Sequence, residues 1–436
     1  MKTFKAAALF CCLAAIVAPG LQAQTQWFSA ADAINSKLPK WFQFSGEFRS
    51  RFEAVSAGGF KPNNSDAYWL TRLRLGFTIR PTSWLKLYAE GQDARAIFKQ
   101  PGQPPFENVW DFRQGYAELG QMDKGMFALR VGRQELSYGD QRLIGPTPWT
   151  NAGRTFDAVR GQFNRGGYKV ELFASSVVNA VNDTWDHHQD GNNLHGARVE
   201  TKNWIPNANV ETYVDWRTQP GLTTEAGAAA KLNEKIPGLR IAGKFQKDFD
   251  YDTEMLKETG TLGTDSIHAW AGHWAVGHTS PKLASKPRVF AEFNFASGDA
   301  NPKDGIRGTF DQLYPSAHDK TGLADQVAWK NIRDFRTGVE TKPVKNVTAN
   351  VVFHNWNLAN KFDGLYTTAN AITARSATGT AGTHVGEELD IQGSWTISKP
   401  LQANFGIGHI FPGEFLRKTT PGNGYTFPYL MLLYKF

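Results

Sequence analysis

Apolar and polar side chains alternate residue by residue along most of this 436-residue chain. Between Trp41 and Glu53, Phe42, Phe44, Phe48 and Phe52 lie on one face together with Gly46, and arginine, glutamate and glutamine lie on the other face. A period of two residues is typical of β-strands, because successive side chains of a strand point to opposite faces. The segments 68–80 and 84–96 repeat the pattern. The chain is therefore predicted to be all-β, with strands that are apolar on one face and polar on the other.

Eighteen candidate strands follow from this alternation. They lie at 41–53, 68–80, 84–96, 111–120, 125–135, 156–164, 168–178, 194–203, 208–217, 223–234, 238–248, 267–279, 287–297, 328–341, 345–357, 384–397, 400–411 and 425–436. Short connections are expected at 81–83, 164–167, 236–237 and 398–400, and long polar loops at 179–193, 249–266, 298–327 and 358–383. An even number of strands with short turns on one side and long loops on the other is typical of transmembrane barrels.

The N-terminus resembles a secretory signal peptide. Lys2 and Lys5 precede an apolar run at 6–18, and a small-residue cleavage site ends at Ala23. The apolar run is too short to span a membrane as a helix. Both cysteines, Cys11 and Cys12, lie within the run, so the mature chain is expected to have no disulfide and no thiolate metal site.

Three segments are therefore predicted. Residues 1–23 form the signal peptide, residues 24–40 a periplasmic arm with one helical turn near 30–38, and residues 41–436 a single barrel. The barrel is expected to be antiparallel and up-and-down, with short periplasmic turns and long extracellular loops.

Composition agrees with a barrel in the outer membrane. The chain has 30 Phe, 14 Trp and 42 Gly, which suits aromatic girdles at the membrane interfaces and tight turns. A closed sheet is required because no backbone group can stay unpaired in hydrocarbon. The terminal strand ends on Phe436, which is similar to the assembly signal of outer-membrane proteins. We predict contact with outer-membrane lipid and lipopolysaccharide, and no nucleic-acid partner, since the net charge of +7 is only a mild excess.

If the apolar faces meet lipid, the polar faces point into the lumen, and the inward positions are rich in basic residues. The predicted pore-lining residues are Arg49, Arg51, Arg72, Arg74, Arg130, Arg160, Arg198, Arg240, Arg288, Arg336 and Lys86. Arginine binds carboxylates through paired hydrogen bonds, so these residues indicate an anion-selective channel. Acidic residues such as Glu47, Glu90 and Glu292 share the inward faces. Internal ion pairs without any ligand are the alternative.

Two stretches resemble the alginate export family of outer-membrane porins. The first is VGRQELSYGDQRLIG at 131–145, followed by WTNAGRTFD at 149–157. The second comprises ASGD at 296–299, TFDQLYP at 309–315, HDK at 318–320 and LADQV at 323–327. The resemblance covers about 44–436 and is to the broad branch of the family, and not to the dedicated alginate secretin of pseudomonads.

The resemblance implies a monomeric 18-stranded barrel with a narrow, positively charged passage for a polyuronate chain. Periplasmic export proteins are a further expected class of partner. The resemblance also implies that the constriction of the passage is lined here by Arg49, Arg74, Arg130, Arg160 and Arg336, and in addition by Arg133 and Arg154. Because the branch differs, the cargo could also be another anionic glycan, a short oligosaccharide or small anions.

Three classes of function remain: a conduit for anionic saccharide, a porin for other small solutes, and a barrel-borne hydrolase. A hydrolase needs a nucleophile and a base within hydrogen-bond reach, and no such set stands at paired positions, so we predict no enzyme. We also predict no cofactor and no metal. The segment 299–305 is interpreted as a turn, and His268, His273 and His278 fall on alternating faces of one strand.

Overall fold

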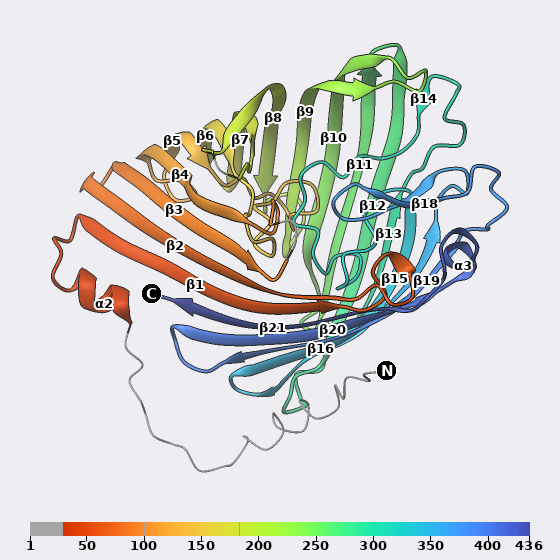
Figure 1. Ribbon diagram of the computed structural model, residues 1–436. Helices are drawn as coiled ribbons and strands as arrows, with labels where there is room; N and C mark the ends of the chain where they lie inside the picture. The colour runs from red at the N-terminus through yellow and green to blue at the C-terminus, as the bar shows by residue number, and fades with distance from the viewer. Residues whose placement is uncertain (1–28, 100–101, 183) are drawn as a thin grey trace.

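Residues 29–99, 102–182 and 184–436 are described by the computed structural model in Figure 1. The predicted signal peptide at 1–23 lies outside these residues and stays a prediction. The helical turn expected in the arm is α2 (Ala30–Asn35), capped by the Ser29 side chain, whose Oγ accepts a hydrogen bond from the Asp32 N–H at 3.2 Å. No helix among the described residues is long and apolar enough to cross a membrane.

Eighteen long strands of the described chain form one closed antiparallel barrel, as predicted. Closure is made by β1 (Phe42–Val55), which pairs with both β2 (Asp66–Thr82) and β21 (Tyr425–Lys435). The other long strands are β3 (Leu85–Ile97), β4 (Asn108–Gly120), β5 (Phe127–Gln134), β6 (Phe156–Arg165), β7 (Tyr168–Asn179), β8 (His187–Thr201), β9 (Ala208–Thr223), β10 (Ala229–Phe245), β11 (Phe249–Leu262), β12 (Asp265–Thr279), β13 (Arg288–Ala296), β15 (Ile332–Val344), β16 (Val347–Leu358), β19 (His384–Thr396) and β20 (Leu401–Pro412).

The small elements belong to connections between these strands. They are η1 (Gly58–Phe60), β14 (Ile306–Arg307), β17 (Gly364–Tyr366), β18 (Ile372–Arg375) and α3 (Glu414–Thr419). We call the end of the barrel that carries α2 and Phe436 the turn end, and the opposite end, which carries the small elements of the connections, the loop end (Figure 1). The long loops 135–155, 297–331 and 359–383 all leave the loop end.

The barrel is apolar outside and polar inside, as the alternation predicts. Phe48 and Phe77 keep 42% and 41% of their surface exposed on the outer face. Arg74, which lies on β2 between Phe77 and the residue opposite Phe48, keeps only 9% of its surface exposed. An exposed aromatic beside a buried arginine places the hydrocarbon outside and the charges inside.

The seam between the first and last strands is completed by side chains. β21 is shorter than β1, so the Asn35 amide of α2 takes the place of a strand partner: its Nδ2 donates to the Phe44 carbonyl at 2.8 Å, and its Oδ1 accepts from the Phe44 N–H at 2.7 Å. The last residue, Phe436, exchanges backbone hydrogen bonds with Gly46 and lays its ring against that glycine.

Two predicted connections are wrong, and their errors cancel in the strand count. The segments 223–234 and 238–248 were expected as two strands with a turn at 236–237, but β10 runs through Pro237 as one strand. Its register with β11 is the same on both sides, with Lys235 opposite Thr259 and Gly238 opposite Leu256. Proline removes one N–H from the ladder without ending the strand here.

The predicted loop 249–266 is mostly β11. Its inward positions hold the acids Asp250, Asp252, Glu254 and Glu258, and its outward positions include Lys257 and threonines. Because both faces carry polar residues, the alternation of apolar and polar side chains is not visible in the sequence. The predicted loop 179–193 is likewise shorter, because β8 already begins at His187.

An arginine on the outer face should destabilise the barrel. Leu75 faces outward near the middle of β2, so Leu75→Arg is expected to lower the free energy of unfolding by about 2–4 kcal/mol. Urea titration in lipid vesicles, read by the heat-modifiable gel shift, measures this. Thr348→Arg, which faces a lumen cavity, is the control and should unfold like the wild type. Equal midpoints for both variants would contradict the assigned sidedness.

The seam offers a second test with a matched glycine. A Cβ at Gly46 would collide with the Phe436 ring, whereas a Cβ at Gly161, another outward strand glycine, would meet open space. We expect Gly46→Val to reduce the yield of folded, heat-modifiable barrel and Gly161→Val to leave it unchanged. Assembly kinetics into vesicles would show the difference, and equal yields would mean that the terminal ring does not contribute to closure.

Candidate functional site

The lumen is partly filled by loops that fold inward from the loop end. In Figure 1 their coils lie within the ring of strands. The insertion of residues 135–155 is not predicted by the alternation of the sequence. The available signal was the set of apolar residues Leu136, Leu143 and Ile144 in a segment without alternation, because all three are buried in a core inside the barrel.

Arginines of β1 and β2 hold the 135–155 loop by its backbone. Arg49 donates to the Pro148 carbonyl at 2.7 Å and to Asn151 Oδ1 at 2.8 Å. Arg72 donates to the carbonyls of Pro148 and Thr150, both at 3.1 Å. Hydrogen bonds from charged donors are about twice as strong as neutral ones, so these arginines anchor the loop.

Arg51 and Arg74 complete the anchor in different ways. Arg51 donates to the Trp149 carbonyl at 2.6 Å, and its guanidinium lies 3.7 Å from the centre of the Trp149 indole. On the other face of that indole, the His318 ring stacks at 3.6 Å, which ties the 297–331 loop to the same point. Arg74 reaches the loop indirectly, through Gln92, whose Nε2 donates to the Ala152 carbonyl at 2.9 Å.

The inserted loops also bind each other. Ile144 and Tyr314 form a parallel β-bridge, with the Tyr314 N–H donating to the Leu143 carbonyl at 2.8 Å. Arg154 donates to the Pro315 carbonyl at 3.0 Å across this joint. The 359–383 loop joins them where the Ala328 N–H donates to the Tyr366 carbonyl at 2.8 Å. Together the three loops narrow the lumen toward the loop end.

Two predicted site residues do not lie where the sequence placed them. Arg133 is on the same face of β5 as the exposed Leu129 and Val131, so it points outward, and it pairs with Asp157 at 2.8 Å. The alternation along β5 predicts this outward direction, but the motif resemblance had assigned Arg133 to the constriction. Arg154 is half-buried at the loop joint, where desolvation lowers its pKa to about 10.

Four other predicted residues face inward and are consumed by ion pairs. Arg198 pairs with Glu211 and Asp215, Arg240 with Asp252, Arg288 with Asp250 and Glu340, and Arg336 with Glu292, all at 2.5–3.2 Å. These are the internal networks that the sequence left as an alternative.

The remaining predicted residues are Lys86, Arg130 and Arg160, of which Arg130 pairs with Glu118 at 2.5 Å and Arg160 pairs with Glu171 at 3.0 Å. All three line an open cavity of about 430 Å³ on the wall formed by β3 to β7. We call this the basic wall. Lys86 donates to the Tyr116 hydroxyl at 2.9 Å, and Arg130 lies 4.5 Å from the centre of the Tyr116 ring. Tyr88, Tyr138 and Lys169 line the same cavity and were not singled out from the sequence. The wall combines cations with aromatic rings.

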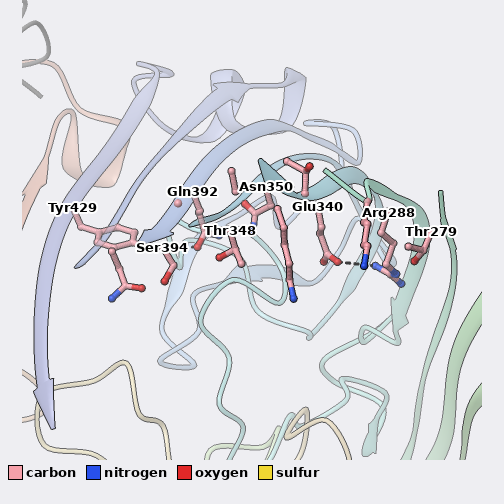
Figure 2. A pocket seen from close by; sticks show the side chains of 14 residues that line it. Thr279, Arg288, Glu340, Thr348, Asn350, Gln392, Ser394 and Tyr429 are labelled. Atoms are coloured by element: carbon pink, nitrogen blue, oxygen red, sulfur yellow. Dashed lines mark hydrogen bonds and ion pairs between the residues drawn. The ribbon is translucent and has the colours of Figure 1, made fainter. Parts of the chain in front are cut away.

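A second cavity, of about 520 Å³, lies on the wall formed by β12 to β21 near the turn end (Figure 2). Amides and hydroxyls dominate its lining, including Asn350, Gln392, Ser394 and Tyr429. These residues were not among the predicted site residues, because those were chosen by charge and these side chains are uncharged.

The one group of potential metal ligands found among the described residues is Asp140, Asp252 and His273, whose ligand atoms lie within 4.8 Å of one another. Asp140 already accepts from Arg142 at 2.9 Å and Lys320 at 3.3 Å, and Asp252 from Arg240 at 2.9 Å. Ammonium and guanidinium groups therefore occupy the place that a cation would take. The segment 299–305 forms a turn in which Asp299 accepts from the Asn301 N–H at 2.9 Å.

A closed barrel of eighteen strands, apolar outside and charged within, is the architecture of outer-membrane porins, and the chain is an integral outer-membrane protein. Within that class, the alginate export family model matches residues 40–428. The chain belongs to the alginate export family, which confirms the resemblance of its two motifs. A comparison with curated proteins finds no match.

Solved structures share the fold at low sequence identity. OccK8 (OprE) of Pseudomonas aeruginosa has a TM-score of 0.62 at 11% identity, covering 91% of this chain and 98% of its own. OpdK of the same organism has a TM-score of 0.62 at 9% identity with the same coverage. A structure of OpdK with vanillate gives a TM-score of 0.60 at 10% identity, covering 90% and 98%. At these identities the likeness supports the fold alone.

The loop anchor makes a direct prediction for conductance. Arg49→Ala combined with Arg72→Ala removes charged hydrogen bonds worth about 1.5–3 kcal/mol each and should release the 135–155 loop from the wall. Single-channel conductance in planar bilayers is expected to rise, and the loop should become sensitive to protease. Arg288→Ala, which removes an inward arginine away from this anchor, should change neither. Wild-type conductance in the folded double variant would show that the loop is held by other contacts.

Proposed function

We propose that this protein is a passive outer-membrane channel that carries an anionic polysaccharide or oligosaccharide along an arginine-lined lumen. The observation that carries the proposal is uncompensated charge. Among the described residues, Arg49, Arg74 and Arg154 have no carboxylate partner and donate to carbonyl and amide oxygens instead. Arg49 and Arg74 are buried against the inserted loop, so they attract anions through the electric field of their charges and not by direct contact.

The basic wall supports a saccharide as cargo. Its cations lie beside the rings of Tyr88, Tyr116 and Tyr138, around a cavity that opens to the lumen. Carboxylates pair with lysine and arginine, while the apolar face of a sugar ring packs on aromatic rings. A uronate unit presents both features at once.

A small-anion porin is the second candidate function. The inserted loops favour it, because a narrowed lumen passes small solutes more readily than a polymer. The solved structure of OpdK with vanillate shows that a porin of this fold has been crystallised with a small aromatic carboxylate. A polymer would need the loop anchor to open, and a small anion would not.

We propose that the protein transports its cargo without catalysing a reaction. Transport of an anion needs only a charged passage. We further propose that the barrel acts as a monomer in contact with outer-membrane lipid and lipopolysaccharide, and that periplasmic export proteins deliver the cargo.

The proposal predicts that the basic wall sets ion selectivity. A triple variant with Lys86→Gln, Arg130→Gln and Arg160→Gln should move the reversal potential in a KCl gradient from anion preference toward zero, because it removes three lumen cations. The matched control is Arg95→Gln, Lys257→Gln and Arg333→Gln, which removes the same charge from outward strand positions. Planar-bilayer recordings measure both. A wild-type protein without anion preference, or equal shifts in both triples, would overturn the proposal.

A further inference from the structure

One row of side chains crosses seven strands at the same level of the lumen wall. Backbone register places Thr279 opposite Arg288, Arg288 opposite Glu340, and Glu340 opposite Asn350. The row continues with Gln392, Gly406 and Tyr429, each opposite the one before. Figure 2 shows Thr279, Arg288, Glu340, Asn350, Gln392 and Tyr429 as a band along the 520 Å³ cavity. We call this band the lumen row.

The lumen row faces inward along its whole length. The sequence neighbours of its members, such as Val339, Val351 and Ile391, are exposed on the outer face. Because side chains alternate along a strand, Glu340, Asn350 and Gln392 must point into the lumen.

The middle of the band carries hydrogen-bonding groups without net charge. Asn350 and Gln392 lie directly opposite each other, and the adjacent level brings Thr348, Ser394 and Asn404 into register. Gly406 leaves space that the Tyr429 ring fills from the next strand. The result is a patch of amides and hydroxyls bounded by an aromatic ring, unlike the charged basic wall.

Two polar atoms in this patch are buried without a partner. They are Asn350 Oδ1, an acceptor, and Asn404 Nδ2, a donor. A buried polar atom without a hydrogen bond costs free energy, so a complementary group is expected at such a place. A sugar hydroxyl both donates and accepts, so it can satisfy either atom once the terminal amide turns toward the cavity.

A cation stands beside the same patch. Lys342 lines the cavity and has no carboxylate partner among the described residues. An ammonium at this edge can pair with the carboxylate of a sugar acid while the amides bind its hydroxyls. The cavity volume falls within the range of small-ligand sites, about 300–1,000 Å³.

We infer that the patch of Thr348, Asn350, Gln392, Ser394 and Asn404, with Tyr429 and Lys342 at its edges, is a binding subsite for a sugar-acid unit near the turn end of the channel. The inference rests on the proposed function and deepens it. The basic wall attracts any anion, whereas this subsite distinguishes a hydroxylated anion from a plain carboxylate. It is therefore the part of the lumen that gives specificity for saccharide.

The test compares two trivalent anions as blockers of single channels. Trigalacturonate carries three carboxylates and many hydroxyls, and tricarballylate carries three carboxylates and no hydroxyl. Added on the turn side of the wild-type channel, trigalacturonate should block at lower concentration. In a variant with Asn350→Ala and Asn404→Ala, its blocking constant should weaken about tenfold through the loss of two hydrogen bonds, with tricarballylate unchanged.

The matched control is Asn209→Ala, an inward asparagine at the turn end of β9 that donates to Glu200 at 2.9 Å, and it should leave the block unchanged. If the double variant fails the heat-modifiability gel, Thr348→Val with Ser394→Ala tests the adjacent level and should weaken the same block. The subsite is disproved if trigalacturonate and tricarballylate block the wild type equally, or if the folded variants bind trigalacturonate as the wild type does. If the wild-type channel shows no anion preference, the proposed function itself is wrong. The reversal potential distinguishes this outcome from failure of the subsite alone.

Discussion

Backbone pairing between β1 and β21 is the contact on which the rest of this structure depends. In hydrocarbon an unpaired N–H or C=O costs several kcal/mol, so a sheet can cross the membrane only when its first and last strands meet. Seven registered residue pairs join the two strands from Glu47 to Glu53, and Asn35 and Phe436 continue the pairing beyond them. Once the sheet is closed, alternation assigns every strand residue to lipid or to lumen.

The lumen then acts as a polar interior that the sequence can use for two purposes. On β1 and β2 the arginines bind backbone carbonyls of an inserted loop, which orders a core of apolar side chains inside the barrel. On β3 to β7, Lys86 and the ion-paired Arg130 and Arg160 line an open cavity. Arg51 strengthens the loop anchor, since its guanidinium stacks on Trp149 and pairs with Glu53 at 2.5 Å. Arginine thus holds the loop that narrows the passage on β1 and β2, and it lines the passage on β3 to β7.

The outward and inward faces could be predicted because alternation is local. Phe48, Phe77 and Arg74 lie on the sides that their strand positions indicate. The strand count could be predicted only through two errors that cancel: Pro237 was expected to end a strand, and the acid-rich β11 was expected to be a loop. Both errors come from residue preferences that the neighbouring strands of a closed sheet override.

The candidate site was less predictable, because it depends on which atoms lie across the lumen. The inward direction of Arg49 and Arg72 follows from the sequence, but their partners, the carbonyls of Pro148 and Thr150, lie about a hundred residues away in a loop without a repeating pattern. The lumen row was missed for a different reason. Asn350, Gln392 and Tyr429 are brought together only by the register of separate strand pairs. None of them is charged, so a prediction based on charged residues does not include them.

The sidedness of the strands can be measured directly. The chain from Ser29 onward contains no cysteine, since Cys11 and Cys12 are the two in the sequence, so single cysteines can be introduced at neighbouring positions. Suitable pairs are Asn350 with Val351, Gln392 with Ile391, and Lys86 with Leu87. In lipid vesicles, the first member of each pair should react with a water-soluble thiosulfonate. A fluorophore on the second should instead be quenched by brominated lipid. The reverse pattern in these pairs would contradict a barrel that is apolar outside and polar within.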